Sequence, residues 1–335
     1  MLLVNASIVR SRSSEASSEP RRTYMENHGV KPMSACPVCG SGSTHSVAPY
    51  RHENLIFAGC RRSLCTECEM MFASPMPNAA ALSDYNASYF ATAHGGPPTN
   101  RLALAFFSAI ARLRLGFLRR YLDEHQIGVD RVLELGPGPG FFARRWLEDA
   151  PQSVYSAVET DKSCFDSLRK LGVHLVEPSA VIATDLVVMS HVLEHVPDPV
   201  RFVQAATRGL RPDGALFIEV PCRDWEHKTL DEPHLLFFDK KSMRKLLADL
   251  GFVDIELSYH GQRISRLKTA SPLRAKLMAI RGKLISWGLI APFARMQPGM
   301  EPVTSPLERA AVAPFQAHRE STEPAWWLRA VARKR

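Results

Sequence analysis

Short apolar runs recur through the middle of the chain, and each is separated from the next by a stretch long enough for a helix or a loop. Alternation of this kind is typical of strands and helices that build a parallel sheet with both faces covered. The pattern therefore predicts an α/β fold. Its five expected parallel strands occupy residues 131–135, 154–159, 173–176, 185–190 and 215–220.

Two further segments, residues 253–259 and 326–333, alternate apolar and polar residues like strands. Ahead of the first strand, residues 101–126 place apolar side chains three or four positions apart. This spacing predicts an amphipathic helix or a pair of helices. We expect this segment to cover the sheet and to roof a pocket at its edge.

The composition is that of an ordinary globular protein, with 45% hydrophobic and 23% charged residues among 335. No apolar run reaches the ~20 residues that span a bilayer, and the N-terminal residues lack the basic leader and long apolar core of a signal peptide. We therefore expect a cytoplasmic protein without a transmembrane segment. Residues 1–30 are rich in Ser, Glu and Arg, and we expect them to be disordered.

The positive net charge of +8 belongs to the last part of the chain, because residues 261–335 contain 14 Lys and Arg against 4 Asp and Glu. Such a region can contact nucleic acid, anionic lipid or a phosphorylated substrate, or can be a solvated surface. Within it, residues 272–287 have the pattern of a basic amphipathic helix. A lid, a homodimer contact and a contact with an anionic membrane surface are all compatible with that pattern. Residues 297–324 repeat proline without periodicity, which predicts a loop.

Four of the seven cysteines form two C-x-x-C pairs, Cys36 with Cys39 and Cys65 with Cys68, with 25 residues between the pairs. Two such pairs can hold a structural Zn²⁺ ion through four tetrahedral thiolates. Residues 31–78 are too few for a large core of their own, so a metal would stabilise this zinc-ribbon-like segment. The alternatives are a redox pair or free thiols.

Three glycines follow the first predicted strand at alternate positions, Gly136, Gly138 and Gly140. Glycine permits the tight turns and the close backbone approach that a bound ligand requires. The spacing G-x-G-x-G differs from the G-x-G-x-x-G of dinucleotide-binding folds. The sequence Val132-Leu-Glu-Leu-Gly-Pro-Gly-Pro-Gly140 resembles the first motif of the class I S-adenosylmethionine (SAM)-dependent methyltransferases.

The resemblance implies a Rossmann-like, seven-stranded methyltransferase sheet whose last strand runs antiparallel to the others. Residues 127–335 would form the methyltransferase domain, preceded by a helical cap or linker over residues 79–126. Because the last two strands of this family pair with each other, residues 261–324 would be an insertion between neighbouring strands.

The resemblance also implies where the cofactor SAM binds. Glu159 ends the second predicted strand, where an acidic residue binds the two ribose hydroxyls. His191 follows the fourth strand and is expected to line the methionine end of SAM. The predicted cofactor-binding residues are Glu134, Gly136, Gly138, Gly140, Glu159, Asp161 and His191.

Residues 191–195, His-Val-Leu-Glu-His, also match the H-x-x-E-H pattern of a class of zinc proteases. We reject a protease, because the motif follows the fourth strand at the place where methyltransferases carry a similar segment. Glu194 and His195 are instead expected to bond the neighbouring loop.

The residues around the cysteine pairs are similar to those of zinc-ribbon methyltransferases from sugar and cell-surface polysaccharide pathways. Those proteins share a Cys-Pro-x-Cys-Gly start, a second C-x-x-C, a Pro-x-Pro turn and a Tyr-rich segment, all present here. One departure is Glu69, which stands where the family usually has glycine. In this family the Tyr-rich segment lies near the acceptor pocket, so Tyr85 and Tyr89 are candidate catalytic-site contacts. Packing is their alternative role.

Residues 231–238 resemble the segment that supplies a general base in sugar C-methyltransferases, and His234 stands at the matching position. A neutral imidazole there accepts a proton from a hydroxyl, or from a carbon beside a keto group. The alternative is that His234 is a wall or a hydrogen-bonding residue of the pocket.

The resemblance therefore implies methyl transfer from SAM to a small acceptor, such as a nucleotide-linked sugar or an intermediate of a polysaccharide or natural product. One alternative is an RNA base methyltransferase that uses the zinc segment and the basic insertion to hold nucleic acid. Another is a SAM-binding partner protein without catalytic activity.

Overall fold

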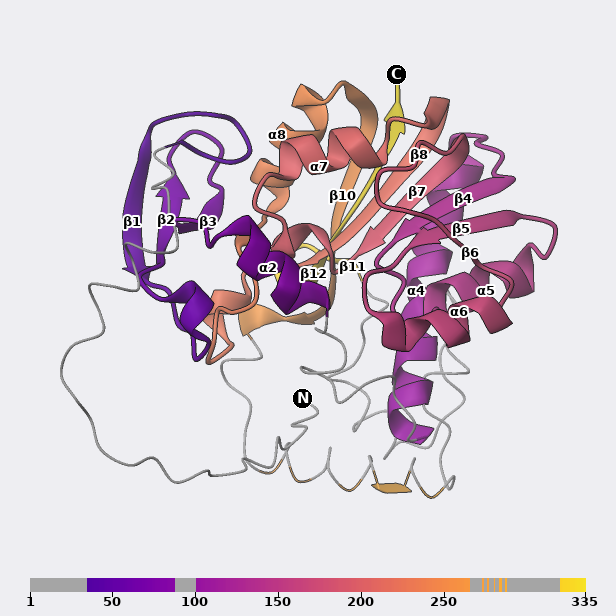
Figure 1. Ribbon diagram of the computed structural model, residues 1–335, viewed down its shortest axis with the longest axis horizontal. Helices are drawn as coiled ribbons and strands as arrows, with labels where there is room; N and C mark the ends of the chain where they lie inside the picture. Colours follow the sequence, from indigo (N-terminus) through magenta and orange to yellow (C-terminus); the bar gives the residue numbers. More distant parts are fainter. Residues whose placement is uncertain are drawn as a thin grey trace.

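The computed structural model describes residues 35–87, 101–265 and 320–335, together with six single residues within 273–287. Predictions for residues 1–30, for Tyr89 and for most of the insertion therefore lie outside the described residues. The described residues form one large sheet with helices on both faces and one small sheet beside it (Figure 1).

The large sheet is mixed, with the strand order β11-β10-β12-β8-β7-β4-β5-β6. The strands from β6 to β8 run parallel to one another, whereas β12 lies antiparallel between β8 and β10. This topology confirms the predicted Rossmann-like sheet with an antiparallel last strand, and a two-residue strand, β11, extends its edge. The strands are β4 (Arg131–Leu135), β5 (Val154–Val158), β6 (His174–Leu175), β7 (Thr184–Ser190), β8 (Leu210–Pro221), β10 (Phe252–Arg263), β11 (Glu320–Ser321) and β12 (Ala325–Lys334).

Helices cover both faces of the large sheet (Figure 1). Successive side chains of its central strands point to opposite faces. On β7, Leu186 and Val188 join the core under α4, α5 and α6. Val187 and Met189 point the other way and join the core under α7 and α8. Burial on both faces explains the continuous apolar run of this strand. The helices are α4 (Arg101–Glu124), α5 (Phe141–Asp149), α6 (Phe165–Lys170), α7 (Pro199–Ala206) and α8 (Lys240–Asp249).

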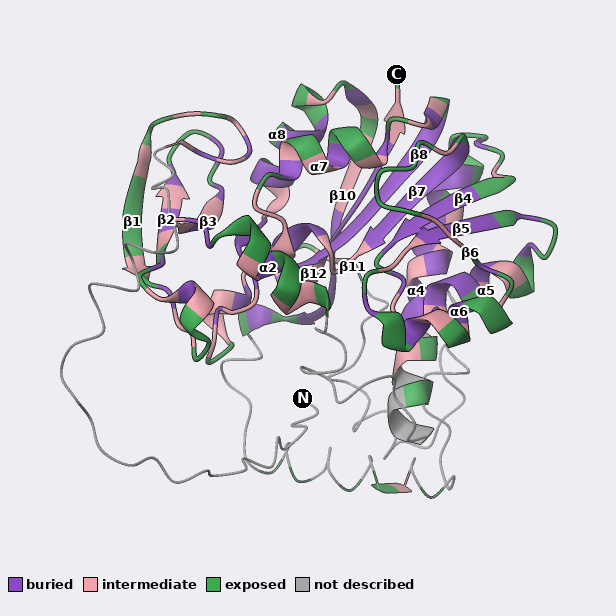
Figure 2. Cartoon of the chain, viewed as in Figure 1, coloured by how far each residue is buried: buried purple, intermediate pink, exposed green. Residues whose placement is uncertain are grey.

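The apolar stripe predicted over residues 101–126 forms one continuous helix, α4. Its buried side chains include Leu115, Leu118 and Leu122, which recur at intervals of three or four residues. Figure 2 shows the resulting layers, with largely buried strands inside and exposed residues on the outward faces of the helices. None of the helices within the described ranges has both the length and the apolar character needed to cross a membrane.

Residues 35–78, which we call the cysteine module, form the small antiparallel sheet together with a strand from elsewhere in the chain. Strand β9 (Leu236–Phe237) lies between β8 and α8 in sequence, yet it pairs with β3 through Phe72 and Leu236. The sequence predicted only a loop there. A strand of two residues is too short to show a periodic pattern, and β9 is a strand only because it pairs with β3. The remaining elements are β1 (Thr44–Pro49), β2 (Arg61–Cys65), β3 (Met71–Ser74), α2 (Ala79–Ala87) and the short helices η1 (Leu55–Phe57), η2 (Lys162–Cys164), η3 (Leu193–His195) and η4 (Asp224–Glu226).

Candidate active site

The glycine-rich loop leaves β4 at the carboxyl edge of the parallel strands, where open α/β folds bind their ligands. Gly136 has φ +65°, a left-handed conformation that L side chains rarely adopt. A Cβ atom at this position would lie 2.6 Å from Cγ2 of Val192. The loop therefore packs directly against residues 191–195, which follow β7.

Two of the predicted acidic residues lie beside this loop. Glu134 is buried and accepts a hydrogen bond from the hydroxyl of Tyr155 at 2.7 Å. Burial raises the pKa of Glu134 to about 7, so a large fraction of this carboxyl is protonated near neutral pH. Glu159 follows β5 and accepts hydrogen bonds from the backbone N–H groups of Gly138 and Asp161, each at 2.8 Å. The structure thus brings Glu159 to the glycine loop.

His191 lies at the end of β7 between two buried carboxylates. Its Nε2 is 3.1 Å from Oε1 of Glu219, and its Nδ1 is 3.3 Å from Oε1 of Glu194. Desolvation alone would lower the pKa of His191, but the contacts with both carboxylates outweigh it and raise the pKa. Glu219 in turn accepts hydrogen bonds from Arg329 at 2.6 Å and from Arg114 at 2.7 Å. A buried charge network therefore holds the His191 ring.

His234 is buried in the loop between β8 and β9, residues 222–235, which we call the His234 loop. Its Nδ1 lies 2.5 Å from Oδ2 of Asp224, and Nζ of Lys228 lies 3.0 Å from the same oxygen. Burial would raise the pKa of Asp224, but His234 and Lys228 hold it well below its usual range. A carboxylate on Nδ1 fixes the orientation of the ring and leaves Nε2 as its second functional nitrogen.

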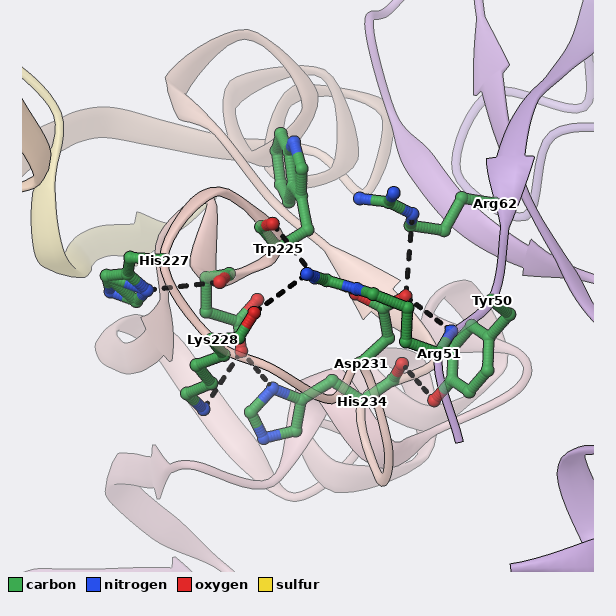
Figure 3. Close-up of polar contacts among 9 residues, drawn as sticks. Tyr50, Arg51, Arg62, Trp225, His227, Lys228, Asp231 and His234 are labelled. Atoms are coloured by element: carbon green, nitrogen blue, oxygen red, sulfur yellow. Dashed lines mark hydrogen bonds and ion pairs between the residues drawn. The ribbon is translucent and has the colours of Figure 1, made fainter. Parts of the chain in front are cut away.

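The cysteine module fastens the His234 loop in place (Figure 3). Arg51 donates through its backbone N–H to Oδ2 of Asp231 at 2.7 Å, and its guanidinium reaches the carbonyl oxygen of Trp225 at 2.8 Å. The hydroxyl of Tyr50 donates to the carbonyl oxygen of His234 at 2.9 Å. Because Asp231 is buried, its pairing with Arg51 satisfies a charge that would otherwise be costly.

The two predicted tyrosines have different outcomes. Tyr85 lies on α2, half-buried, with its ring edge-on to Phe57 at 5.8 Å between centroids. Phe57 stacks in turn on Tyr50, the residue that bonds the His234 carbonyl. Tyr85 is therefore brought close to the cysteine module and the His234 loop, whereas Tyr89 lies outside the described residues.

The four predicted zinc ligands meet in one cluster in the cysteine module. The sulfur atoms of Cys36 and Cys68 are 3.5 Å apart, those of Cys39 and Cys65 are 3.6 Å apart, and all four lie within 4.8 Å of one another. Zinc–sulfur bonds of about 2.3 Å in a tetrahedron place the sulfurs about 3.8 Å apart. The donor set and its spacing therefore fit Zn²⁺. Cys60 instead donates to a main-chain carbonyl at 3.1 Å.

Sequence reasoning missed several of the residues that organise these groups. Glu219 carried a signal, because it is an acid inside an otherwise apolar strand. Asp224, Arg114 and Arg329 carried none, since charged residues at these positions are compatible with an exposed surface.

Comparisons with known proteins agree with this geometry. Residues 101–257 match the family model of a methyltransferase domain. A probable SAM-dependent methyltransferase of Mycobacterium tuberculosis strain CDC 1551 is 31% identical over 145 residues, which are 40% of this chain and 53% of that protein. The matched region is similar to methyltransferase domains. The glycine loop, Glu159 and His191 lie inside the matched range of the methyltransferase domain, and the cysteine module lies outside it.

The similarities cover part of the chain and part of most of the matched proteins. The chain spans about half the length of the curated relatives it matches, which include a probable SAM-dependent methyltransferase of strain H37Rv with the same identity and coverage. A possible histamine N-methyltransferase of Thermotoga maritima has a TM-score of 0.39 and 16% identity, covering 68% of this chain and all of that one. A phosphoethanolamine N-methyltransferase of Haemonchus contortus has a TM-score of 0.46 and 15% identity, covering 79% and 62%. Similarities at this level identify no acceptor for the methyltransferase domain.

Proposed function

We propose that this protein is an enzyme that transfers the methyl group of SAM to a small acceptor. The observation that carries the proposal is the meeting of the glycine loop after β4 with Glu159 after β5, through the hydrogen bond from Gly138. A carboxylate has about four acceptor sites, and the backbone N–H groups of Gly138, Thr160 and Asp161 use three of those on Glu159. Glu159 can therefore hold this loop and still accept a bond from a ribose hydroxyl. Glu134 and His191 flank the same edge of the sheet.

The acceptor that we propose is a nucleotide-linked sugar, or an intermediate of a polysaccharide or natural product. Methyl transfer from a sulfonium is an in-line displacement, which requires that the acceptor be aligned and water excluded. The cysteine module supports such a site because it packs against the His234 loop and contributes the aromatic residues Tyr50, Phe57 and Tyr85 beside it.

His234 is the residue that we propose for activation of the acceptor. Its Nδ1 is occupied by Asp224, so Nε2 is the nitrogen available to act. An orienting carboxylate of this kind is the usual partner of a histidine that works in a site. A passive wall residue does not require a buried charged partner.

We propose that Zn²⁺, bound by Cys36, Cys39, Cys65 and Cys68, has a structural role. Four protein ligands close the coordination sphere, and a closed site holds a fold together without activating a substrate. A reducing cytoplasm, which we propose as the location of the protein, keeps these thiols available for the metal.

Labelled methyl transfer tests the proposed function. The full-length protein is incubated with methyl-labelled SAM and, in separate reactions, with nucleotide sugars, cell-extract metabolites or total RNA. The proposal predicts label in the small-molecule fractions and formation of S-adenosylhomocysteine (SAH). Label in RNA alone would favour a nucleic-acid methyltransferase. Bound SAM without transfer to any fraction would favour a non-catalytic partner, and either result contradicts the proposal.

His234→Ala is expected to lower methyl transfer by at least about 100-fold, the lower range for loss of a proton-transfer group. Its affinity for SAM should stay close to that of the wild type, because His234 lies on the acceptor side. Turnover is measured as transfer of label from methyl-labelled SAM to the acceptor, and SAM affinity is measured by calorimetry. His174→Ala, on the exposed edge strand β6, is the matched control and should change neither quantity. Normal turnover in His234→Ala removes this residue from the mechanism.

A further inference from the structure

A second group of possible metal ligands lies away from the cysteines, at Glu194, His195 and His234, which we call the Glu–His–His cluster. One ligand atom from each residue lies within 4.8 Å of the others. Glu194 and His195 come from η3, and His234 comes from a loop 39 residues later in the chain. Two imidazoles and one carboxylate are a donor set that binds divalent transition metals in proteins.

The carboxylate of this cluster is unusual in its surroundings. The side chain of Glu194 is only 1% exposed, yet neither of its oxygens accepts a hydrogen bond from the described residues. Ring nitrogens face one oxygen, at 3.3 Å for His191 and 3.9 Å for His195. Buried carboxylates normally accept hydrogen bonds or bind a cation, because their desolvation is otherwise costly. Besides its contact with the His191 ring, Glu194 therefore keeps acceptor capacity for a cation.

The third ligand is already oriented as metal-binding histidines are. Such histidines donate their second ring nitrogen to a carboxylate, which fixes the tautomer and the ring. In His234 that carboxylate is Asp224, at 2.5 Å from Nδ1, and Figure 3 shows the ring directed into the polar network of its loop. Arg51 and Tyr50 fasten the loop itself. The position of the His234 ring thus does not depend on the metal.

The cluster is next to the proposed SAM site. Val192 contacts the Gly136 position of the glycine loop, and Glu194 and His195 follow two and three residues later on the same turn. Residues 192–195 thus contact the proposed SAM site at one end and supply two ligands of the cluster at the other. A cation bound beside His234 would lie where we propose that the methyl acceptor binds.

We propose that Glu194, His195 and His234 bind a divalent transition-metal ion that activates an acceptor hydroxyl, a step that rests on the proposed function. The metal-bound hydroxyl loses its proton to solvent more readily than a free one. The resulting oxygen attacks the methyl carbon of SAM, a C–O bond forms and the S–CH₃ bond breaks. The electron pair of that bond stays on sulfur, which gives neutral SAH. With the metal bound, His234 activates the acceptor as a ligand of the metal through Nε2, which replaces direct proton transfer to that nitrogen.

Mn²⁺ is the probe for this site, because it favours carboxylate and imidazole ligands over the thiolates of the cysteine module. Full-length, zinc-loaded protein is titrated with Mn²⁺ by calorimetry without SAM or acceptor. One ion per chain is expected. Electron spin echo spectroscopy of the bound Mn²⁺ in the wild-type protein should show couplings to imidazole nitrogens. This spectroscopic readout needs no variant and no knowledge of the acceptor.

Glu194→Gln keeps the shape of the side chain and should weaken Mn²⁺ binding by at least about 100-fold, since even outer partners of metal ligands contribute 10–100-fold. His195→Gln is the second variant and should lose one nitrogen coupling. Glu226→Gln, in the same loop as His234 but outside the cluster, should bind Mn²⁺ like the wild type.

The inference is overturned if Mn²⁺ does not bind, if bound Mn²⁺ shows no imidazole coupling, or if Glu194→Gln binds it unchanged. SAM binding and methyl transfer, measured on the same samples, keep this result separate from the proposed function. Methyl transfer without Mn²⁺ binding rejects the cation site alone. Mn²⁺ binding at these ligands without SAM binding rejects the proposed function alone.

Discussion

A Gly136→Ala variant is expected to remain folded and to bind SAM at least about 100-fold more weakly than the wild-type protein, a loss of ~3 kcal/mol. The left-handed conformation of Gly136, at φ +65°, costs a residue with a Cβ atom about 1–2 kcal/mol. The new Cβ would also lie 2.6 Å from Val192, so the glycine loop or the segment after β7 has to move. Both line the proposed cofactor site, and calorimetric titration with SAM measures the effect.

Gly128→Ala is the matched control for this variant. Gly128 lies before β4, at the opposite end of the strand from the glycine loop, and a Cβ atom there meets nothing within 4 Å. This control should bind SAM with the affinity of the wild type. Equal SAM affinity in Gly136→Ala and Gly128→Ala would contradict the placement of the cofactor at the glycine loop.

Cys65→Ser is expected to lose bound zinc and to unfold the cysteine module while leaving the large sheet folded. Cys65 is fully buried, with its sulfur 3.6 Å from that of Cys39. Structural zinc contributes on the order of 10 kcal/mol to the folding of small zinc-binding segments. Zinc content by atomic emission and hydrogen exchange of the amides in β1, β2 and β3 measure the outcome.

The same variant should affect methyl transfer more than SAM binding. The cysteine module contacts the His234 loop through Arg51, and its strand β3 pairs with β9. The hydrogen bond between the glycine loop and Glu159 involves no residue of the cysteine module. Cys164→Ser is the matched control, because Cys164 is buried but lies outside the cysteine module. This variant should keep the zinc bound to the cysteine module. Retention of zinc and of exchange protection in Cys65→Ser would show that the four cysteines do not form a metal site.

The strands of the large sheet were predictable because burial on both faces leaves an unbroken apolar run, as in residues 185–190. The antiparallel last strand could not come from such a pattern. It followed from the resemblance that the glycine motif carried, and the pairing of β12 with β8 and β10 confirms it.

The candidate site was only partly predictable. The sequence predicted roles in the site for Glu159, His191 and His234 because each follows a predicted strand or matches a family segment, and these roles stay predictions. The sequence could not predict their partners, since the contacts of Asp224 and Glu219 with them are tertiary. The bond between Arg51 and Asp231 joins residues 180 positions apart, and such pairs leave no local pattern in one sequence.

A crystal structure of the full-length protein with SAH will show whether the edge of the sheet around the glycine loop holds the cofactor. We expect SAH against residues 136–140, with a ribose hydroxyl bonded to Glu159 and its homocysteine end beside His191. SAH bound elsewhere on the chain, or held at the ribose by a different residue while Glu159 faces away, would contradict this expectation.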